Sequence, residues 1–511
     1  MARQSRATKV ALALIMVCGS ALGPTTVVHA SPVFDTIGDT TSTGGLQARV
    51  IPGGSAAVYF NPALLVEVDA ELSVGFQLVS QHIGITLDGR PGTQFAVPEK
   101  LENAGHADGT RFDNYAIATN WLQKGRMSDK KDASLEARPR QGAGTGHETY
   151  TYEAFGMVVK PFQQRLALGV HGLIPNGEFT KIRAFYADER EQYFSNSLHP
   201  ELYSDRLTAL SLAFGAGFAL TRRLSLGVGT SLNLKASVGA PTYVVDTGNL
   251  GKILIDMDTS VNMSLAPHFG LSVAPLDWLR ITATAHAPKR VELGTGFTFL
   301  LANGIEQQSG ITFVADYTPW QVALGSSVDV LRVSEQTLTI AGTLLFAAWS
   351  SYEDRHGFEP SPSYEWADTL SPTLGAHYAW KDLRAMVDMA YAPTPVPEQT
   401  GRSNYVDNDR LSGSAGADYR FELWGSELRA GAQLQAHRLL ARHQSKLPTP
   451  TRADGENLAP ELVKDEVPDD AQLGGEPVEG VEGLQTNNPG WPGFGSKGWI
   501  LGATLYLAVS I

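Results

Sequence analysis

The sequence predicts an all-β fold, a transmembrane antiparallel β-barrel of about fourteen strands, and three observations lead to this prediction. In the stretch Leu224 to Gly239 the even positions are mostly apolar, and the odd positions are Gly, Ser, Asn or Lys. A strand with one apolar face and one small, polar face suits a wall between lipid and an enclosed lumen. Only 18% of the residues are charged, whereas about 25% is usual in soluble domains. Tight turns also alternate with longer links along the chain.

The first 30 residues are expected to be a cleaved signal peptide. Three basic residues precede the apolar run Val10 to Val17, and Val28-His29-Ala30 resembles a signal-peptidase site. The apolar run is too short to cross a membrane as a helix. The sole cysteine, Cys18, lies in this segment, so the mature chain would contain neither a disulfide nor a thiol nucleophile.

Residues 31–69 lack the alternation of a barrel strand and form a separate N-terminal region. Their compact feature is GGSAAVYFNPALL, from Gly53 to Leu65. Ser55 is expected to cap a short helical turn, and Asn61-Pro62 to end it.

Residues 70–511 are predicted to form the barrel. The strand candidates are 70–88, 148–161, 164–185, 199–221, 223–245, 252–276, 277–303, 308–330, 333–353, 366–380, 383–394, 410–425, 427–442 and 496–511. Turns of two or three residues, such as Arg222-Arg223 and Lys381-Asp382, alternate with longer links, of which 89–147 and 443–495 are the longest. Short turns at one rim and long external loops at the other are typical of outer-membrane barrels.

Charge and composition exclude several kinds of site. The net charge of −13 argues against nucleic acid as a partner, because phosphate binding needs a basic surface. The loop 443–495 carries clustered carboxylates, but their spacing matches no defined calcium loop. These carboxylates are Asp465, Glu466, Asp469 and Asp470. We therefore predict neither a metal site nor a cofactor.

The alternation also places a few charged side chains in the lumen. Arg384 and Arg429 would face inward, as would Lys235. A carboxylate ligand in a low-dielectric lumen needs a fixed cation, so these three are candidate ligand-binding residues. The alternative is that the two arginines form a structural charge network with Asp388 and Glu427.

Several stretches resemble the FadL/OMPP1/TodX family of outer-membrane transporters for hydrophobic compounds. GGSAAVYFNPALL is similar to the Asn-Pro-Ala box of the family's N-terminal hatch. The segment Leu338 to Asp354 is similar to a family strand that ends in Trp-Ser. The segment Leu383 to Phe421 is similar to the stretch in which one strand ends in Pro-x-Pro and Asp-Asn-Asp-Arg opens the next. Pro319 to Leu331 fits a further family strand.

This resemblance implies a fourteen-stranded barrel plugged by a hatch, here residues 31–69. It implies passive passage of long-chain fatty acids or aromatic hydrocarbons, with a lateral exit through the wall toward the bilayer. Asn61, Pro62 and Ala63 would lie at the hatch end beside that exit, or would only anchor the hatch. The expected partners are a hydrophobic small molecule and outer-membrane lipids, and the expected state is a monomer in the outer membrane of a Gram-negative cell.

Other function classes remain open at this point. A general porin, a structural or adhesive surface barrel, and a barrel hydrolase would share the wall pattern. No Gly-x-Ser-x-Gly motif occurs, and His171, His268, His286 and His437 lie on separate strands without metal-ligand spacing. We therefore predict no catalytic residue and no enzyme activity.

Overall fold

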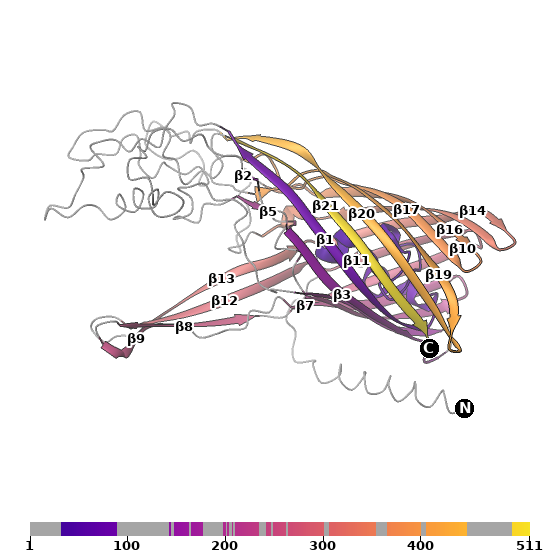
Figure 1. The fold of residues 1–511 in the computed structure, drawn as a ribbon, viewed down its shortest axis with the longest axis horizontal. Helices are drawn as coiled ribbons and strands as arrows, with labels where there is room; N and C mark the ends of the chain where they lie inside the picture. Colours follow the sequence, from indigo (N-terminus) through magenta and orange to yellow (C-terminus); the bar gives the residue numbers. More distant parts are fainter. Residues whose placement is uncertain are drawn as a thin grey trace.

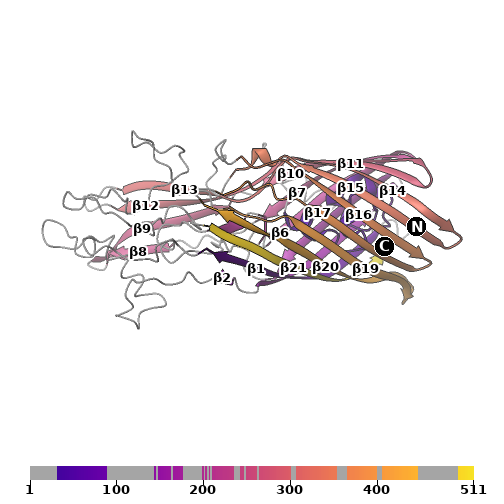
Figure 2. The same ribbon diagram turned by 90° about the horizontal axis from the view of Figure 1, so that it is seen from above.

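A computed structural model of the chain shows a tilted β-barrel with a folded segment inside it (Figures 1 and 2). The structure describes residues 32–88, 143–144, 148–162, 165–176, 198–200, 202–203, 207, 210–234, 242–246, 249–261, 264–300, 306–353, 365–399, 405–446 and 493–511. The predicted signal peptide, Lys235 and the acidic residues 465–470 lie outside these ranges.

The wall is one closed ring of fourteen antiparallel strands, which confirms the predicted barrel. In chain order the strands are β1 (Glu71–Leu87), β3 (Glu148–Val159), β4 (Leu166–Pro175), β6 (Leu210–Thr221), β7 (Leu224–Leu234), β10 (Ser264–Leu276), β11 (Leu279–His286), β14 (Gln321–Val333), β15 (Gln336–Ala347), β16 (Thr369–Trp380), β17 (Leu383–Ala392), β19 (Arg410–Leu423), β20 (Ser426–Ser445) and β21 (Gly493–Ser510). The ring closes because β1 pairs with both β21 and β3. Closure leaves no free sheet edge, as a bilayer requires.

The tight turns gather at one end of the barrel, which we call the turn end; the opposite end is the loop end. Ser334, Lys381 and Trp424 have positive φ angles of 51°, 53° and 53° at these turns. The first and last strands also meet at the turn end, where the amide of Ile511 donates to the carbonyl of Ala70 at 3.0 Å. An even number of strands places both chain ends of the barrel on the same rim.

The strand faces follow the predicted alternation. On β7, Leu226 and Val228 point outward and are 41% and 46% exposed, whereas Ser231 is fully buried. On β21, Leu505 is 63% exposed and its neighbour Thr504 is 1% exposed. The large apolar side chains therefore form the outer surface, which is the arrangement expected where lipid rather than water surrounds the wall.

Four predicted long strands are each two strands in the structure, so their predicted extents are wrong. Beyond the ring, β8 (Thr242–Asp246), β9 (Asn249–Val261), β12 (Lys289–Leu300) and β13 (Glu306–Thr318) form a second antiparallel sheet. It extends away from the barrel (Figure 1). Pro288 separates β11 from β12, and Pro319 separates β13 from β14. Proline has no amide to donate to a ladder, and at these two positions it lies where one strand ends and the next begins.

Short pieces complete the described part. They are β2 (Ala143–Gly144), which pairs with β1, and the parallel pair β5 (His199–Pro200) and β18 (Tyr405–Val406). A 3-10 turn, η6 (Trp349–Ser351), follows β15. None of the described helices has both the length and the hydropathy needed to span a membrane.

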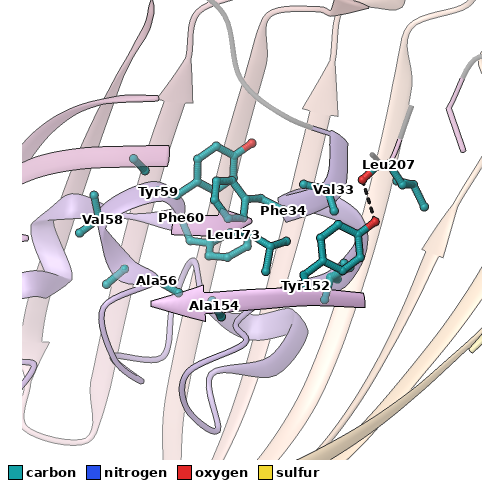
Figure 3. Close-up of a cluster of buried hydrophobic side chains, with 14 of the residues drawn as sticks. Val33, Phe34, Ala56, Val58, Tyr59, Phe60, Tyr152, Ala154, Leu173 and Leu207 are labelled. Carbon is teal, nitrogen blue, oxygen red and sulfur yellow. Dashed lines mark hydrogen bonds between the residues drawn. The ribbon is translucent and has the colours of Figure 1, made fainter. Parts of the chain in front are cut away.

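The N-terminal residues 32–69, which we call the plug, lie within the ring of strands (Figure 1). They contain α2 (Pro32–Ile37), η1 (Gly45–Gln47), α3 (Ala57–Phe60) and η2 (Pro62–Val66). Val33, Phe34 and Tyr59 are fully buried and pack against Leu173 and Tyr152 of the wall (Figure 3). The Tyr152 hydroxyl donates to the carbonyl of Leu207 at 2.7 Å at the edge of this cluster (Figure 3). A shared apolar core thus joins the plug to the wall.

The expected cap at Ser55 is wrong. Ala56 precedes α3 without a side-chain cap, and the Ser55 hydroxyl instead contacts Ser73 of β1 at 3.1 Å. Asn61 ends α3, as expected, and its side chain caps η2 by accepting from the amide of Ala63 at 3.2 Å. Ser55 thus joins the plug to the barrel wall, because its hydroxyl lies within hydrogen-bond distance of β1.

Candidate functional site

Asn61, Pro62 and Ala63 lie against glycines of three neighbouring wall strands. We call this the glycine side; it is formed by Gly217 of β6, Gly227 of β7 and Gly270 of β10. The plug backbone occupies the space where wall side chains would stand. A Cβ on Gly227 would lie 2.2 Å from the amide nitrogen of Ala63, and one on Gly270 would lie 2.2 Å from Oδ1 of Asn61.

The Asn61 side chain ties this contact together. Its amide nitrogen donates to the carbonyl of Arg49 at 3.1 Å and to the carbonyl of Leu271 at 3.4 Å. The first bond is within the plug and the second reaches β10. The ladders that join β4, β6, β7 and β10 pair residue by residue around this point, so the wall is closed beside Asn61, Pro62 and Ala63.

The opposite part of the wall, from β14 to β17 with β19, holds the plug by polar side chains; we call it the polar side. Gln47 donates to the carbonyl of Ala341 at 3.2 Å and accepts from the hydroxyl of Thr343 at 2.8 Å. The amide of Leu46 donates to Asp388 Oδ2 at 2.8 Å, and the other carboxylate oxygen lies 3.0 Å from His377 Nε2. Asp388 therefore fixes η1 to β17.

Arg49 links the plug to two further strands. Its guanidinium forms an ion pair with Asp35 at 2.9 Å. It also contacts Thr284 of β11 at 3.2 Å and Gln321 of β14 at 3.3 Å. Arg49 is buried, and the carboxylate of Asp35 compensates its charge within the protein.

The two predicted luminal arginines face inward but have other partners than expected. Arg384 makes a two-pronged contact with Asp418, at 2.9 and 2.6 Å. Arg429 donates to Glu71 at 2.7 Å. Asp388 and Glu427, the partners considered from the sequence, bind other groups instead. Each guanidinium is thus already paired with a wall carboxylate, and a ligand role for either one stays a prediction, as does the role of Lys235.

Ser55 and His171 form the nearest approach to a nucleophile and base in the described lumen. The Ser55 hydroxyl lies 3.1 Å from His171 Nδ1, and both side chains are fully buried. The hydroxyl also contacts Thr41 at 3.1 Å. His171 Nε2 has no hydrogen-bond partner, so no carboxylate orients the ring as a hydrolase would require. The pair fastens the plug to β4. Within the described residues, no group of His, Cys, Asp or Glu has the arrangement of a metal site.

A cavity of about 170 Å³ lies between the plug and the polar side, toward the loop end. We call it the loop-end cavity. Its apolar lining includes Phe60 of the plug, Leu345 of β15, Trp349 and the loop residues Pro393 and Pro395. Its polar lining includes Asp35, Tyr203, Asp407 and Arg410. Aromatic rings and prolines together with a few polar groups are typical of a small-molecule site.

A second cavity of about 230 Å³, the turn-end cavity, lies on the same side of the lumen. On β15, Thr343 and Leu345 line the loop-end cavity, whereas Thr337 and Thr339 line the turn-end cavity. Between them lies Ala341, whose carbonyl accepts from Gln47. The contact between η1 and β15 therefore lies between the residues of β15 that line the two cavities.

Arg410 and Asp407 are two of the cavity residues that sequence reasoning did not assign. They belong to the Asp-Asn-Asp-Arg motif, which was the available signal, but the motif alone does not show that the residues border a cavity. Asp407 lies in the loop before β19 and is 4% exposed. Burial raises the pKa of its carboxyl to about 6, while the nearby Arg410 and Arg442 guanidiniums act in the opposite direction.

The chain is similar to known proteins in structure, but its sequence matches none of those it was compared with. No protein-family model matches the chain, and no curated protein matches its sequence. In structure the chain is similar to a FadL homologue of Pseudomonas aeruginosa, with 13% identity, a TM-score of 0.49, and 96% of this chain and 99% of that one covered. The toluene transporter TbuX of Ralstonia pickettii shows 14% identity and a TM-score of 0.41, with 94% and 98% covered. The toluene transporter TodX of P. putida shows 11% identity and a TM-score of 0.44, with 95% and 99% covered.

Proposed function

We propose that this barrel carries small hydrophobic molecules passively across the outer membrane of a Gram-negative cell. The observation that supports this best is the loop-end cavity, a space between plug and wall that is lined partly by apolar and aromatic side chains, in a barrel with an apolar exterior. A general porin needs an open watery lumen, but here the plug fills the lumen with buried side chains. Passage requires only binding sites and movement of the plug, and no covalent chemistry.

The sequence resemblance also suggests where the molecule leaves. Phe60 lines the loop-end cavity and directly precedes Asn61, which contacts β10. On the glycine side, Gly217, Gly227 and Gly270 have no side chains that would fill the space if the plug moved away. We therefore favour a lateral exit beside Asn61, Pro62 and Ala63, reached by displacement of the plug because the wall is closed there at rest.

Movement of the plug can be tested by locking it. The hydroxyls of Ser55 and Ser73 are 3.1 Å apart, so the pair Ser55→Cys and Ser73→Cys should form a disulfide between plug and β1. Uptake of labelled toluene or oleate into proteoliposomes should fall severalfold when the pair is oxidised and recover on reduction. The matched control is Ala417→Cys with Ala432→Cys, which joins two wall strands that already pair. Unchanged uptake with a fully formed plug disulfide would contradict a mobile plug.

The exit route can be tested by filling each cavity. Ser371 lines the loop-end cavity and Ala379 lines the turn-end cavity, both on β16. With a lateral exit, Ser371→Trp should strongly reduce uptake, and Ala379→Trp should leave it nearly unchanged. Equal loss of uptake in both variants would indicate a route along the barrel axis through both cavities, and would overturn the lateral exit.

A further inference from the structure

Arg410 differs from the luminal arginines Arg49, Arg384 and Arg429 because no ion pair joins it to a carboxylate of the described residues. Arg49, Arg384 and Arg429 each have a carboxylate oxygen within 2.9 Å. The contact of Arg410 with a side chain is a long one, 3.4 Å from Nη1 to the hydroxyl of Thr36. Its Nε is buried and has no hydrogen-bond acceptor. Asp407 and Asp35 act on this charge without forming an ion pair with it. A buried donor that lacks an acceptor is costly, which indicates that another group satisfies the guanidinium.

The group that satisfies Arg410 would have to come from the loop-end cavity. Arg410 lines this cavity together with Thr36, its hydroxyl contact. The other cation at the cavity, Arg49, is already paired with Asp35. Arg410 is therefore the cation that remains available to a ligand among the described lining residues.

The cavity also limits the size of such a ligand. Its volume of about 170 Å³ is close to that of an apolar protein cavity that binds benzene, about 150 Å³. One aromatic ring with a small substituent fits this space, whereas a long acyl chain does not fit it whole. Phe60, Leu345 and Trp349 supply the apolar surface that a ring would contact.

We propose that the loop-end cavity is a binding site for a single-ring aromatic carboxylate, with its ring between Phe60 and Trp349 and its carboxylate on the guanidinium of Arg410. The planar guanidinium offers paired donors that match the two oxygens of a carboxylate. This assignment rests on the proposed transport function, and it names a narrower substrate class for the same cavity.

The charge of the site depends on Asp407, which lines the cavity together with Arg410. Asp407 is influenced by Arg410, Arg442 and Tyr203, and by hydrogen bonds from Thr394 and from the Asn408 backbone. Because burial raises the pKa of Asp407 to about 6, its charge is largely lost at pH 5 and largely present at pH 7.5. A ligand carboxyl with an ordinary pKa of about 4 stays mostly ionised at pH 5. Benzoate should therefore bind more tightly at pH 5 than at pH 7.5.

The test is a titration of the full-length protein in detergent with benzoate, toluene and oleate, followed by tryptophan fluorescence and calorimetry. Toluene has the ring without the charge, and oleate has the charge with a long chain. Arg410→Gln should weaken benzoate binding at least about tenfold and change toluene binding less than about twofold. Arg410→Lys keeps the charge without the paired donors, so it should give an intermediate loss. The control is Arg420→Gln, which alters the same strand at the turn end and should leave all three affinities unchanged.

The outcomes separate the two proposals. If none of the three compounds binds, the proposed transport of hydrophobic molecules fails. If toluene or oleate binds but benzoate does not, or if benzoate binds equally to wild type and Arg410→Gln, the aromatic carboxylate site is overturned while the transport proposal survives. Equal weakening of toluene and benzoate in folded Arg410→Gln and Arg410→Lys would assign Arg410 a purely structural role, which also overturns the site.

Discussion

The two sides of the lumen hold the plug in opposite ways. On the glycine side, Gly217, Gly227 and Gly270 let the plug backbone touch the strands directly, and no space is left. On the polar side, Gln47 and Asp388 reach across by hydrogen bonds, and two cavities lie above and below that contact. Close packing fixes position, because any added atom collides, whereas hydrogen bonds between side chains leave gaps that a solute can enter. The binding function should therefore lie on the polar side and the packing contact on the glycine side.

The largest effect is expected from a single methyl group on the glycine side. Gly227→Ala would place Cβ 2.2 Å from the plug backbone, so the plug or β7 must shift. We expect a loss of about 1–3 kcal/mol in the free energy of unfolding, measured with urea in lipid vesicles, and a rise in bilayer conductance as the plug loosens. Gly342→Ala on β15 is the control, because its Cβ would meet the nearest atom at 3.8 Å. Equal stability of the two variants would show that the glycine side does not fix the plug.

The next effect is a pH dependence that arises on the polar side. Asp407 has a raised pKa of about 6 against an ordinary 3.8, so the folded protein retains this proton where the unfolded chain has lost it. Its contribution to stability is present below pH 4 and is lost as the pH rises from 4 to 6, by at most about 3 kcal/mol in total. Asp407→Asn should flatten the stability curve between pH 4 and 6. A curve with the wild-type slope in this variant would assign the dependence to other groups.

The smallest of the three effects concerns the contact between η1 and β17. Asp388→Asn keeps the shape of the side chain but removes the charge that accepts from Leu46 and contacts His377. We expect a loss of about 1 kcal/mol in stability and faster hydrogen exchange at the Leu46 amide. Exchange at the Ala63 amide, on the glycine side, should not change. Faster exchange at both amides would mean that the plug responds as one unit and that the two sides do not differ.

The sequence predicted the wall well because the period of two is a local signal. Leu226 and Val228 point outward and Ser231 inward as the alternation requires. Strand lengths were overestimated near Pro288 and Pro319, because the side-chain alternation continues across the positions where the backbone passes from the ring into the second sheet.

The site was harder to predict because it depends on contacts between distant parts of the chain. Arg429 faces inward as expected, but its partner Glu71 is 358 positions away, and only closure of the ring brings them together. The Asp-Asn-Asp-Arg motif was visible, yet the lack of an ion pair at Arg410 depends on where the neighbouring carboxylates fold. Periodicity shows which way a side chain faces and not what it faces.

The most direct test of a hydrophobic binding site in this barrel is to locate a hydrophobic ligand in the lumen. Crystals of the full-length protein soaked in 4-bromotoluene would give anomalous scattering from bromine. We predict bromine in the loop-end cavity, between Phe60 and Trp349 on the polar side. Bromine found only on the lipid-facing exterior, with none in that cavity, would contradict a hydrophobic binding site inside this barrel.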